Sequence, residues 1–501
     1  MIQSQYPILI IITPLITSLL VLIVGRWLKQ SAYYLSIIAL ITTTLESLRI
    51  LWEVIQHGTL HYRMGNWRPP WGIEYVIDHL SAFLIVIITT IGLCVVVYSK
   101  ESIEKELPEK IVPFYCILLL LITGLLGMVA TGDMFNLYVF LEVSALTAYG
   151  LIGLGEKRAP LASFRYLMMG TIGASFYLLG VGYLYLITGS LNMADISTRL
   201  PELYESKVVL VAFAFLIIGI SVKLAIFPLH SWLPDAYTHA PSAVSAFIAP
   251  TMTKVAAYML VRIMFSVFGT KFAIETVPIT TILAWLGIVA MIVGSIYAIK
   301  QSDLKRMLAY SSIAQIGYIV LGIGLANRLG LTGGLLHILN HAFMKGCLFL
   351  VAGAIILQVE GRNIYRFKDL YRQMPYTMTA FVIAAFSMIG IPPTSGFFSK
   401  LYLILGSIEA NQWIFVAVIL LSSLLNVVYF INVVRTVYFG PSEAEIQTNP
   451  DKVRSYTPEA KEVPWSMRLP IITTAAAILL LGIFNGTIID QVIKFIIPTG
   501  I

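Results

Sequence analysis

Four charged side chains stand deep inside stretches that are otherwise apolar: Glu142, Lys223, Lys254 and Lys400. A charge at the centre of a membrane costs about 2.5–3.5 kcal/mol on insertion scales, so a charge kept at that depth is a candidate for function. Lysine and glutamate both take up and release protons, which makes proton movement the chemistry to consider. The alternative is a structural ion pair between Glu142 and one lysine. That pair leaves two lysines without a partner, because Glu142 is the one deep carboxylate that the sequence identifies.

A second group of titratable side chains lies in the stretch LLHILNHAFMKGCLFL. His337, His341 and Lys345 are spaced i, i+4 and i+8, so they stack along one face of a helix. Imidazole titrates near neutral pH, and we therefore predict a proton relay on this face. Two imidazoles without a carboxylate or thiolate are an incomplete metal site, so no metal is expected. A packed histidine pair in the core is the remaining alternative. His230 and Asp133 are further candidates.

Two of the apolar stretches are predicted to be broken helices. Pro228 interrupts Ser221–Asp235, and Pro392 and Pro393 interrupt Ile389–Lys400. Proline lacks the N–H group and clashes with the carbonyl four residues before it. Each break has a deep lysine within two turns. Broken helices at membrane depth occur where they line a wet cavity or a protein interior, and a matched pair in two halves of a chain indicates transport.

The composition excludes a soluble protein. Of the 501 residues, 58% are apolar and 12% are charged, and the mean hydropathy is +0.86. Ordinary globular chains carry about 25% charged residues. The three cysteines lie far apart and form no CxxC pair, so neither a disulfide framework nor an iron–sulfur or zinc site is expected. No nucleotide-binding glycine motif occurs, and we expect no organic cofactor and no nucleic-acid partner.

Fourteen apolar runs are long enough to cross a membrane, since about 20 helical residues span its core. They cover approximately 7–25, 33–55, 78–99, 112–131, 133–154, 165–189, 208–239, 242–268, 276–299, 305–326, 330–358, 376–409, 412–439 and 467–496. The connections on one side hold 20 of the 33 Lys and Arg residues, and those on the other side hold 7. By the positive-inside rule, the richer side is cytoplasmic and both termini are extracytoplasmic. The polar stretch 441–465 is predicted to be a loop without a core of its own.

Several motifs resemble those of the proton-conducting antiporter-like membrane subunits, a family shared by respiratory complex I, membrane-bound hydrogenases and Mrp-type cation/proton antiporters. These motifs are FPLHSWLPDAYTHAPSAVSA (227–246), DLKRMLAYSSIAQIGY (303–318), HILNHAFMKGCLFL (337–350) and GIPPTSGFFSKL (390–401). Two others, NWRPPWGIEYVIDHLSAF (66–83) and GDMFNLYVFLEVS (132–144), are most similar to the D-type membrane component of the Mrp antiporters.

The resemblance implies an all-α polytopic membrane fold of about fourteen helices, with spans 4–8 and 9–13 forming two inverted five-helix repeats, each around a broken helix. The corresponding segments are 1–111 for the first three helices, 112–268 and 269–440 for the repeats, and 441–501 for a loop and the last helix.

The resemblance also implies roles for the charged residues. Glu142 would pair with Lys223, Lys254 would be the central relay that the two histidines continue, and Lys400 would be the outward gate. Ser399 departs from the family pattern, which leads us to expect glycine before the gate residue.

The predicted function is that of a proton-translocating subunit of a multisubunit Na+ (cation)/H+ antiporter in the cell membrane. Its expected partners are other membrane subunits, protons, a monovalent cation and lipid. The rival interpretation is the membrane arm of a redox enzyme, either a hydrogenase or a quinone oxidoreductase like complex I. No distinct cation site is identified in the sequence, so the cation path is predicted to lie in partner subunits.

Overall fold

The computed structural model describes residues 4–155, 157–440, 460–498 and 500–501. Thirteen of its helices are long and apolar enough to cross a membrane, and the paired shorter helices α16 and α17 form a further interrupted crossing. The prediction of about fourteen spans in an all-α fold is therefore confirmed. The predicted loop 441–465 lies mostly outside the described residues.

The crossings begin with α1 (Tyr6–Gly25), α2 (Ser31–His57) and α3 (His79–Glu106). The next group consists of α4 (Ile111–Ala130), α5 (Met134–Gly153), α6 (Ala159–Thr188), α8 (Lys207–Leu224), α9 (Trp232–His239) and α10 (Ser242–Val261), which continues as a π-helix over Arg262–Val267. The last group consists of α12 (Ile279–Ile299), α13 (Leu304–Leu325), α14 (Arg328–Val359), α16 (Pro375–Ile389), α17 (Ser395–Glu409), α18 (Trp413–Phe439) and α21 (Trp465–Ile483).

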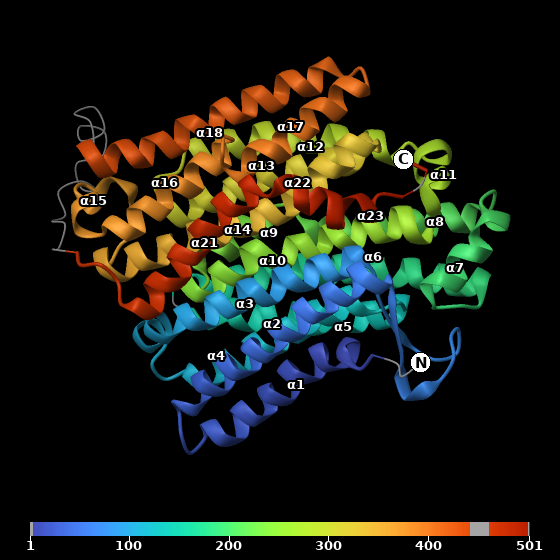
Figure 1. The fold of residues 1–501 in the computed structure, drawn as a ribbon, viewed down its shortest axis with the longest axis horizontal. Helices are drawn as coiled ribbons and strands as arrows, with labels where there is room; N and C mark the ends of the chain where they lie inside the picture. Colours follow the sequence, from blue (N-terminus) through green and yellow to red (C-terminus); the bar gives the residue numbers. More distant parts are fainter. Residues whose placement is uncertain (1–3, 156, 441–459, 499) are drawn as a thin grey trace.

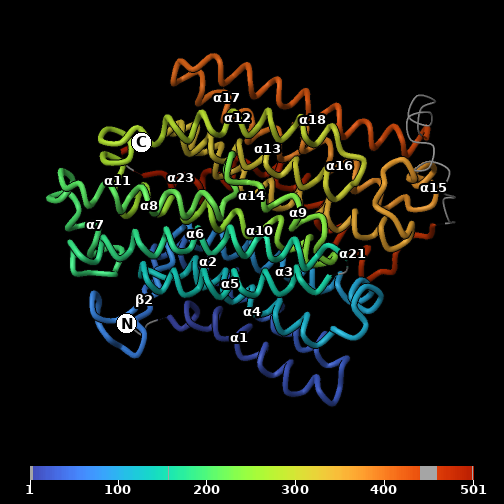
Figure 2. Tube along the Cα trace, turned by 180° about the vertical axis from the view of Figure 1, so that it is seen from behind, coloured from blue at the N-terminus to red at the C-terminus, as the bar shows by residue number. Residues whose placement is uncertain are grey.

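Helices α10 and α14, which carry Lys254, His337, His341 and Lys345, lie in the middle of the bundle (Figures 1 and 2). The most apolar part of the α10 crossing is 100% buried within the chain, and the corresponding parts of α13 and α14 are 89% buried. In α2 and α18 the buried share is 33%, so most of their surface faces outward. The histidine and lysine side chains of the central helices are therefore enclosed by protein.

Both predicted breaks are present. Helix α8 ends at Leu224 and α9 begins at Trp232, with Ala225 in the left-handed region at φ +57°. Helix α16 ends at Ile389 and α17 begins at Ser395, with Gly390 at φ +97°. A helix that ends inside the membrane leaves its last carbonyl groups without the usual intrahelical partners. These carbonyls are available to lysine side chains.

A small hairpin between α2 and α3 was not predicted from the sequence. Strands β1 (Leu60–Arg63) and β2 (Glu74–Ile77) pair antiparallel, with Leu60 opposite Ile77. Four-residue strands separated by a long connection give too short an alternating pattern to be recognised, because the pairing depends on contacts across the connection.

Both termini and the hairpin lie at one end of the bundle, and helix α15 (Leu370–Gln373) lies at the other end (Figure 1). The Lys and Arg distribution predicts that the α15 end is cytoplasmic. Trp71 is 90% exposed in the hairpin connection, and Arg372 is exposed in α15. In a variant without native cysteines, a membrane-impermeant maleimide should label Trp71→Cys in intact cells. Arg372→Cys should be labelled only after permeabilisation. The reverse pattern would contradict the predicted orientation.

Candidate functional site

The ammonium group of Lys400 lies at the point where α16 ends. It donates hydrogen bonds to the carbonyl oxygens of Met388 at 2.8 Å and Ile389 at 2.9 Å, and to Ser423 Oγ at 3.0 Å. It also lies 4.8 Å from the centre of the Tyr318 ring. Lysine has three donors, and here each has an acceptor. The C-terminal end of a helix carries a partial negative charge, so the interrupted helix itself stabilises the ammonium.

His337 forms two hydrogen bonds to neighbouring helices. Its Nε2 lies 2.9 Å from Gln315 Oε1 of α13, and its Nδ1 lies 2.9 Å from Ser399 Oγ of α17. The His341 ring is nearly parallel to the His337 ring, with centroids 5.9 Å apart, as the i, i+4 spacing predicted. Both side chains are fully buried. The histidine face of α14 therefore lies in the protein interior and contacts the broken helix α17.

Lys254 is fully buried beside an internal proline of α10. Its ammonium donates to the Ala249 carbonyl at 2.7 Å and to Thr253 Oγ1 at 3.3 Å. Ala249 directly precedes Pro250, whose missing N–H group weakens the local helix pattern. Like Lys400, Lys254 therefore donates to a backbone carbonyl at a place where proline disturbs the helix.

Lys345 lies on the same face of α14 as the histidines and contacts α13. Its ammonium donates to the Leu308 carbonyl at 2.7 Å and to Ser311 Oγ. Lys254 lies within electrostatic range of both histidines and of Lys345, and Lys400 lies within range of His337. The structure therefore brings five of the predicted residues into one buried cluster, which we call the central cluster: Lys254, His337, His341, Lys345 and Lys400.

Lys223 and Glu142 form a separate group at the end of α8. The Lys223 ammonium lies 3.4 Å from the Tyr149 hydroxyl, and Gly170 of α6 packs closely against that hydroxyl. Glu142, two turns before Tyr149 on α5, interacts with Lys223 electrostatically without a direct ion pair. Its Oε1 atom is buried and has no hydrogen-bond partner. The predicted direct contact is therefore corrected: Tyr149 is the group that touches the ammonium.

The three lysines of the central cluster share one property. Lys254, Lys345 and Lys400 donate to backbone carbonyls, and none of the ion pairs among the described residues includes a lysine. A lysine held by neutral acceptors can lose its proton without leaving an unpaired carboxylate in the low-dielectric interior. This arrangement suits groups that change their protonation state.

The remaining candidates lie outside the central cluster. Asp133 caps α5 by accepting a hydrogen bond from the Asn136 N–H at 2.7 Å, so a structural role accounts for it. His230 lies in the break after α8, where it stacks on Phe227 with centroids 5.2 Å apart. Its Nδ1 is buried without a partner.

Glu46 was missed by the sequence analysis. It lies within the α2 crossing, accepts a hydrogen bond from Thr13 Oγ1 at 3.2 Å, and has a buried Oε2 atom without a partner. Glu142 is therefore not the only deep carboxylate. The predicted span 33–55 includes Glu46, but Glu46 was not among the predicted deep charges; Arg49 and Glu53, which form an i, i+4 ion pair, lie in the same span.

The partners of the titratable groups were also missed. Tyr149, Gln315, Ser399 and Ser423 are uncharged, and the sequence alone does not identify them as the partners of the titratable groups. For Tyr149 the spacing gives a partial indication, because Tyr149 follows Glu142 by seven residues and therefore shares its helix face.

Asp78 and Arg262 form an ion pair at the end of the bundle that holds the termini. Asp78 accepts hydrogen bonds from Arg262 at 2.6 and 2.7 Å and caps α3 through the Ser81 N–H at 2.9 Å. Burial raises the pKa of Asp78, but the charge and hydrogen bonds of Arg262 outweigh it and lower the pKa to about 2. The stability gained from this pair is therefore present above about pH 4 and is lost as the pH falls towards 2.

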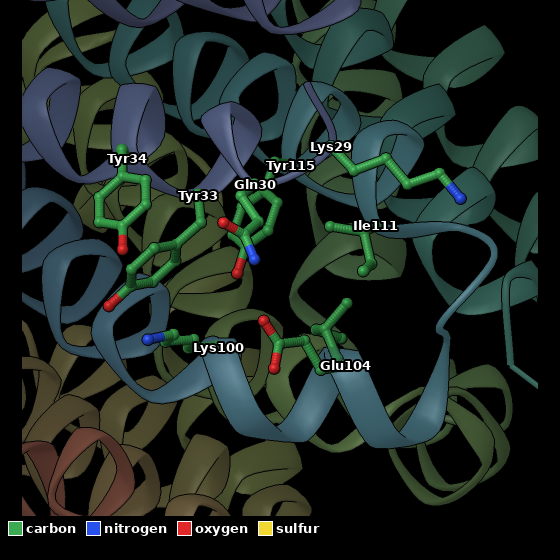
Figure 3. A pocket seen from close by; sticks show the side chains of 9 residues that line it. Lys29, Gln30, Tyr33, Tyr34, Lys100, Glu104, Ile111 and Tyr115 are labelled. Atoms are coloured by element: carbon green, nitrogen blue, oxygen red, sulfur yellow. The ribbon is translucent and has the colours of Figure 1, made fainter. Parts of the chain in front are cut away.

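A surface pocket lies away from these groups, at the end of the bundle that holds the α1–α2 connection (Figure 3). It is lined by residues of α2, α3 and α4 and of the α1–α2 connection, and Lys100 lies 5.7 Å from the centre of the Tyr33 ring. Glu104 and Gln30 point towards each other across it, and Lys29 points away (Figure 3). None of the predicted site residues lines this pocket, so the buried charges are the candidate site.

Within the described residues, fourteen crossings, two interrupted helices and a buried group of lysines and histidines define a class of polytopic membrane protein that moves charge through its interior. The chain belongs to the NADH:quinone oxidoreductase/Mrp antiporter transmembrane family, whose model matches residues 131–426. These residues include both breaks and Glu142, Lys223, Lys254, His337, His341 and Lys400.

Two curated relatives and one solved structure illustrate this membership. NADH-quinone oxidoreductase subunit N of Desulforudis audaxviator is 46% identical over 99% of each chain. The D-type component of the Na(+)/H(+) antiporter of Alkalihalophilus pseudofirmus is 33% identical over 82% of this chain and 83% of its own. A chain of the membrane-bound sulfane sulfur reductase, an archaeal respiratory membrane complex, is 29% identical over 99% of each chain, with a TM-score of 0.89.

Proposed function

We propose that this chain carries protons through the membrane along Glu142, Lys223, Lys254, His337, His341 and Lys400. The observation that carries the proposal is the central cluster, in which the three lysines donate to carbonyl and hydroxyl oxygens and no carboxylate is a direct partner of any of the five basic groups. A structural role would favour fixed ion pairs, because an isolated buried charge is costly. A role in proton movement favours partners that accept both the charged and the neutral form.

Glu142 acts on this row at a distance. When the electrostatic interaction between Glu142 and Lys223 is strong, the proton on Lys223 is favoured, and when it weakens, the desolvated lysine releases that proton towards Lys254. Neighbouring helix axes lie about 8–10 Å apart, so water must connect the side chains. The partnerless ring nitrogens of His341 and the Glu142 Oε1 atom are suitable positions for such water, because buried polar atoms are normally hydrogen-bonded.

For the host complex, we infer a membrane-embedded redox enzyme as the first candidate. This inference rests on the relative named as an NADH-quinone oxidoreductase subunit, which is 46% identical and matches along the whole chain. The Mrp-type cation/proton antiporter, which the motifs at 66–83 and 132–144 favoured in the sequence, is the second candidate and is supported by the 33% identical antiporter relative. The proposed proton path through this chain is the same in the redox enzyme and in the antiporter. The difference is the source of energy, which is electron transfer in one and a cation gradient in the other.

The test is to purify the intact assembly by a tag on this chain, identify its subunits by mass spectrometry, and reconstitute it in liposomes. Proton flux driven by NADH or another electron donor would support the redox complex, and flux driven by a sodium or potassium gradient would support the antiporter. The purified 501-residue chain alone should show neither, because the source of energy lies in its partners. Robust cation-driven flux by the isolated chain would contradict the partner requirement. An intact assembly that moves no protons under either condition would contradict the proposed function.

A further inference from the structure

Ser399 lies on α17 and faces the side of α14 that carries His337 and His341. It is fully buried on α17, next to the gate residue Lys400 in sequence. Its hydroxyl lies 2.9 Å from His337 Nδ1 and 3.1 Å from the Gly396 carbonyl oxygen. A serine hydroxyl has one hydrogen to donate and can also accept. The single hydrogen of Ser399 therefore has two alternative acceptors within hydrogen-bond distance.

These two acceptors match the two protonation states of His337. Gln315 Oε1 faces Nε2, so Nε2 carries a hydrogen in both states. In the neutral imidazole, Nδ1 is bare and accepts the hydrogen of the Ser399 hydroxyl. When a proton is added at Nδ1, that nitrogen becomes a donor to Ser399 Oγ, and the serine hydrogen turns to the Gly396 carbonyl. The number of hydrogens on serine is unchanged, and the added proton stays on the histidine.

We propose that Ser399 is a positioning residue that keeps His337 hydrogen-bonded in both protonation states by rotation of its hydroxyl. No heavy atom has to move between the two arrangements, and both ring nitrogens of His337 and the hydrogen of Ser399 stay hydrogen-bonded when the proton arrives or leaves. An unpaired buried polar group is destabilising, and more so when it is charged, so this exchange lowers the barrier to changing the charge of His337. The inference rests on the proposed function, to which it adds the means by which one relay group changes state.

Several other groups face His337 and influence its protonation. They are Lys400 on α17, Lys254 on α10, His341 on α14 itself, and Tyr318 and Gln315 on α13. None of these groups duplicates the hydroxyl, because the Nδ1 hydrogen bond is made by Ser399. Substitutions of Ser399 therefore change one partner and leave these charges in place.

The experiment compares Ser399→Ala, Ser399→Thr and a matched control, Ser407→Ala, in the intact assembly. Ser407 is also fully buried on α17, but its hydroxyl donates only to the Leu403 carbonyl of its own helix, at 2.8 Å. The alanine variant should translocate protons about tenfold more slowly, because the charged imidazole loses its partner at Nδ1. Its pH profile should shift by about half a unit to one unit to the acid side, since a lost charge-assisted bond disfavours the protonated form. Threonine retains the hydroxyl and should keep the rate within about twofold, with the wild-type pH profile.

Assembly level and thermal stability are measured for each variant. Ser407→Ala should match the wild type in rate, profile and level. A wild-type rate and pH profile in Ser399→Ala, together with loss of transport in His337→Ala, would overturn the proposal and leave the proposed function intact. A uniform loss of rate at every pH that threonine does not restore would mean that Ser399 only fills space, and would also overturn it. Absence of transport in the wild-type assembly would instead be a failure of the proposed function itself.

Discussion

Replacing Lys400 by alanine should reduce proton translocation at least about a hundredfold, and replacing it by arginine should be nearly as damaging. A positioned proton-transfer group contributes about 10²–10⁴-fold to a rate. Arginine keeps the positive charge that the end of α16 stabilises, but a guanidinium group does not lose its proton in a protein. The relay therefore stops in both variants, whereas a purely structural charge would be restored by arginine. The measurement is proton flux in vesicles that contain the intact assembly, normalised to its amount.

The matched control is Lys105→Arg. Lys105 also donates to a backbone carbonyl, that of Leu357 at 2.8 Å, but it does so on the exposed surface at the end of α3. It should tolerate arginine with an unchanged rate. Wild-type flux in Lys400→Arg would show that a permanent charge suffices at the gate, and would contradict a proton-transfer role for Lys400.

Glu142→Ala and Lys223→Ala should each abolish most of the flux while leaving the assembly level largely unchanged. Each variant removes one half of the electrostatic interaction that governs proton release at the end of α8. Glu142→Asp should keep partial activity, because the charge remains but reaches less far. Tyr149→Phe should cost less than either, since it removes the hydroxyl that contacts the ammonium and retains both charges.

The double variant Glu142→Ala/Lys223→Ala separates two explanations. If the two groups were only a structural pair, removing both would restore the protein, because neither would leave an unpaired charge behind. In the proposed relay the double variant remains inactive. Glu46→Gln is the control for the loss of a carboxylate within the membrane, since Glu46 lies on α2 and bonds to Thr13 of α1, away from the central cluster. It should retain flux. Activity of the double variant comparable to the wild type would refute the role of Glu142 and Lys223.

The crossings and the charged residues of the site followed from the sequence because both are local properties. Twenty apolar residues identify a helix, and a lysine within them is visible without knowledge of its surroundings. Both interruptions were also predictable, since proline at positions 228 and 392–393 cannot continue a hydrogen-bonded helix.

The partners of these residues depend on how each helix is rotated and shifted against its neighbours, and residue types do not encode that directly. Tyr149 therefore replaced Glu142 as the direct contact of Lys223, and Gln315 and Ser399 were not recognised as the partners of His337. The sequence shows Ser399 only as a departure from the family pattern. In the fold, its hydroxyl reaches the imidazole because α17 begins beside α14.

The absence of lysine ion pairs among the described residues also limits how many protons the chain can store. Two unit charges 8 Å apart repel by about 2 kcal/mol at an effective dielectric constant of about 20. The central cluster holds five basic groups and no carboxylate among its direct partners. We therefore expect that only some of the five basic groups are protonated at one time. The arrival of a proton on one group then favours the release of a proton from a neighbouring protonated group. The number of protons moved in each transport cycle would then be set by the repulsion between protonated groups rather than by the number of residues that line the path.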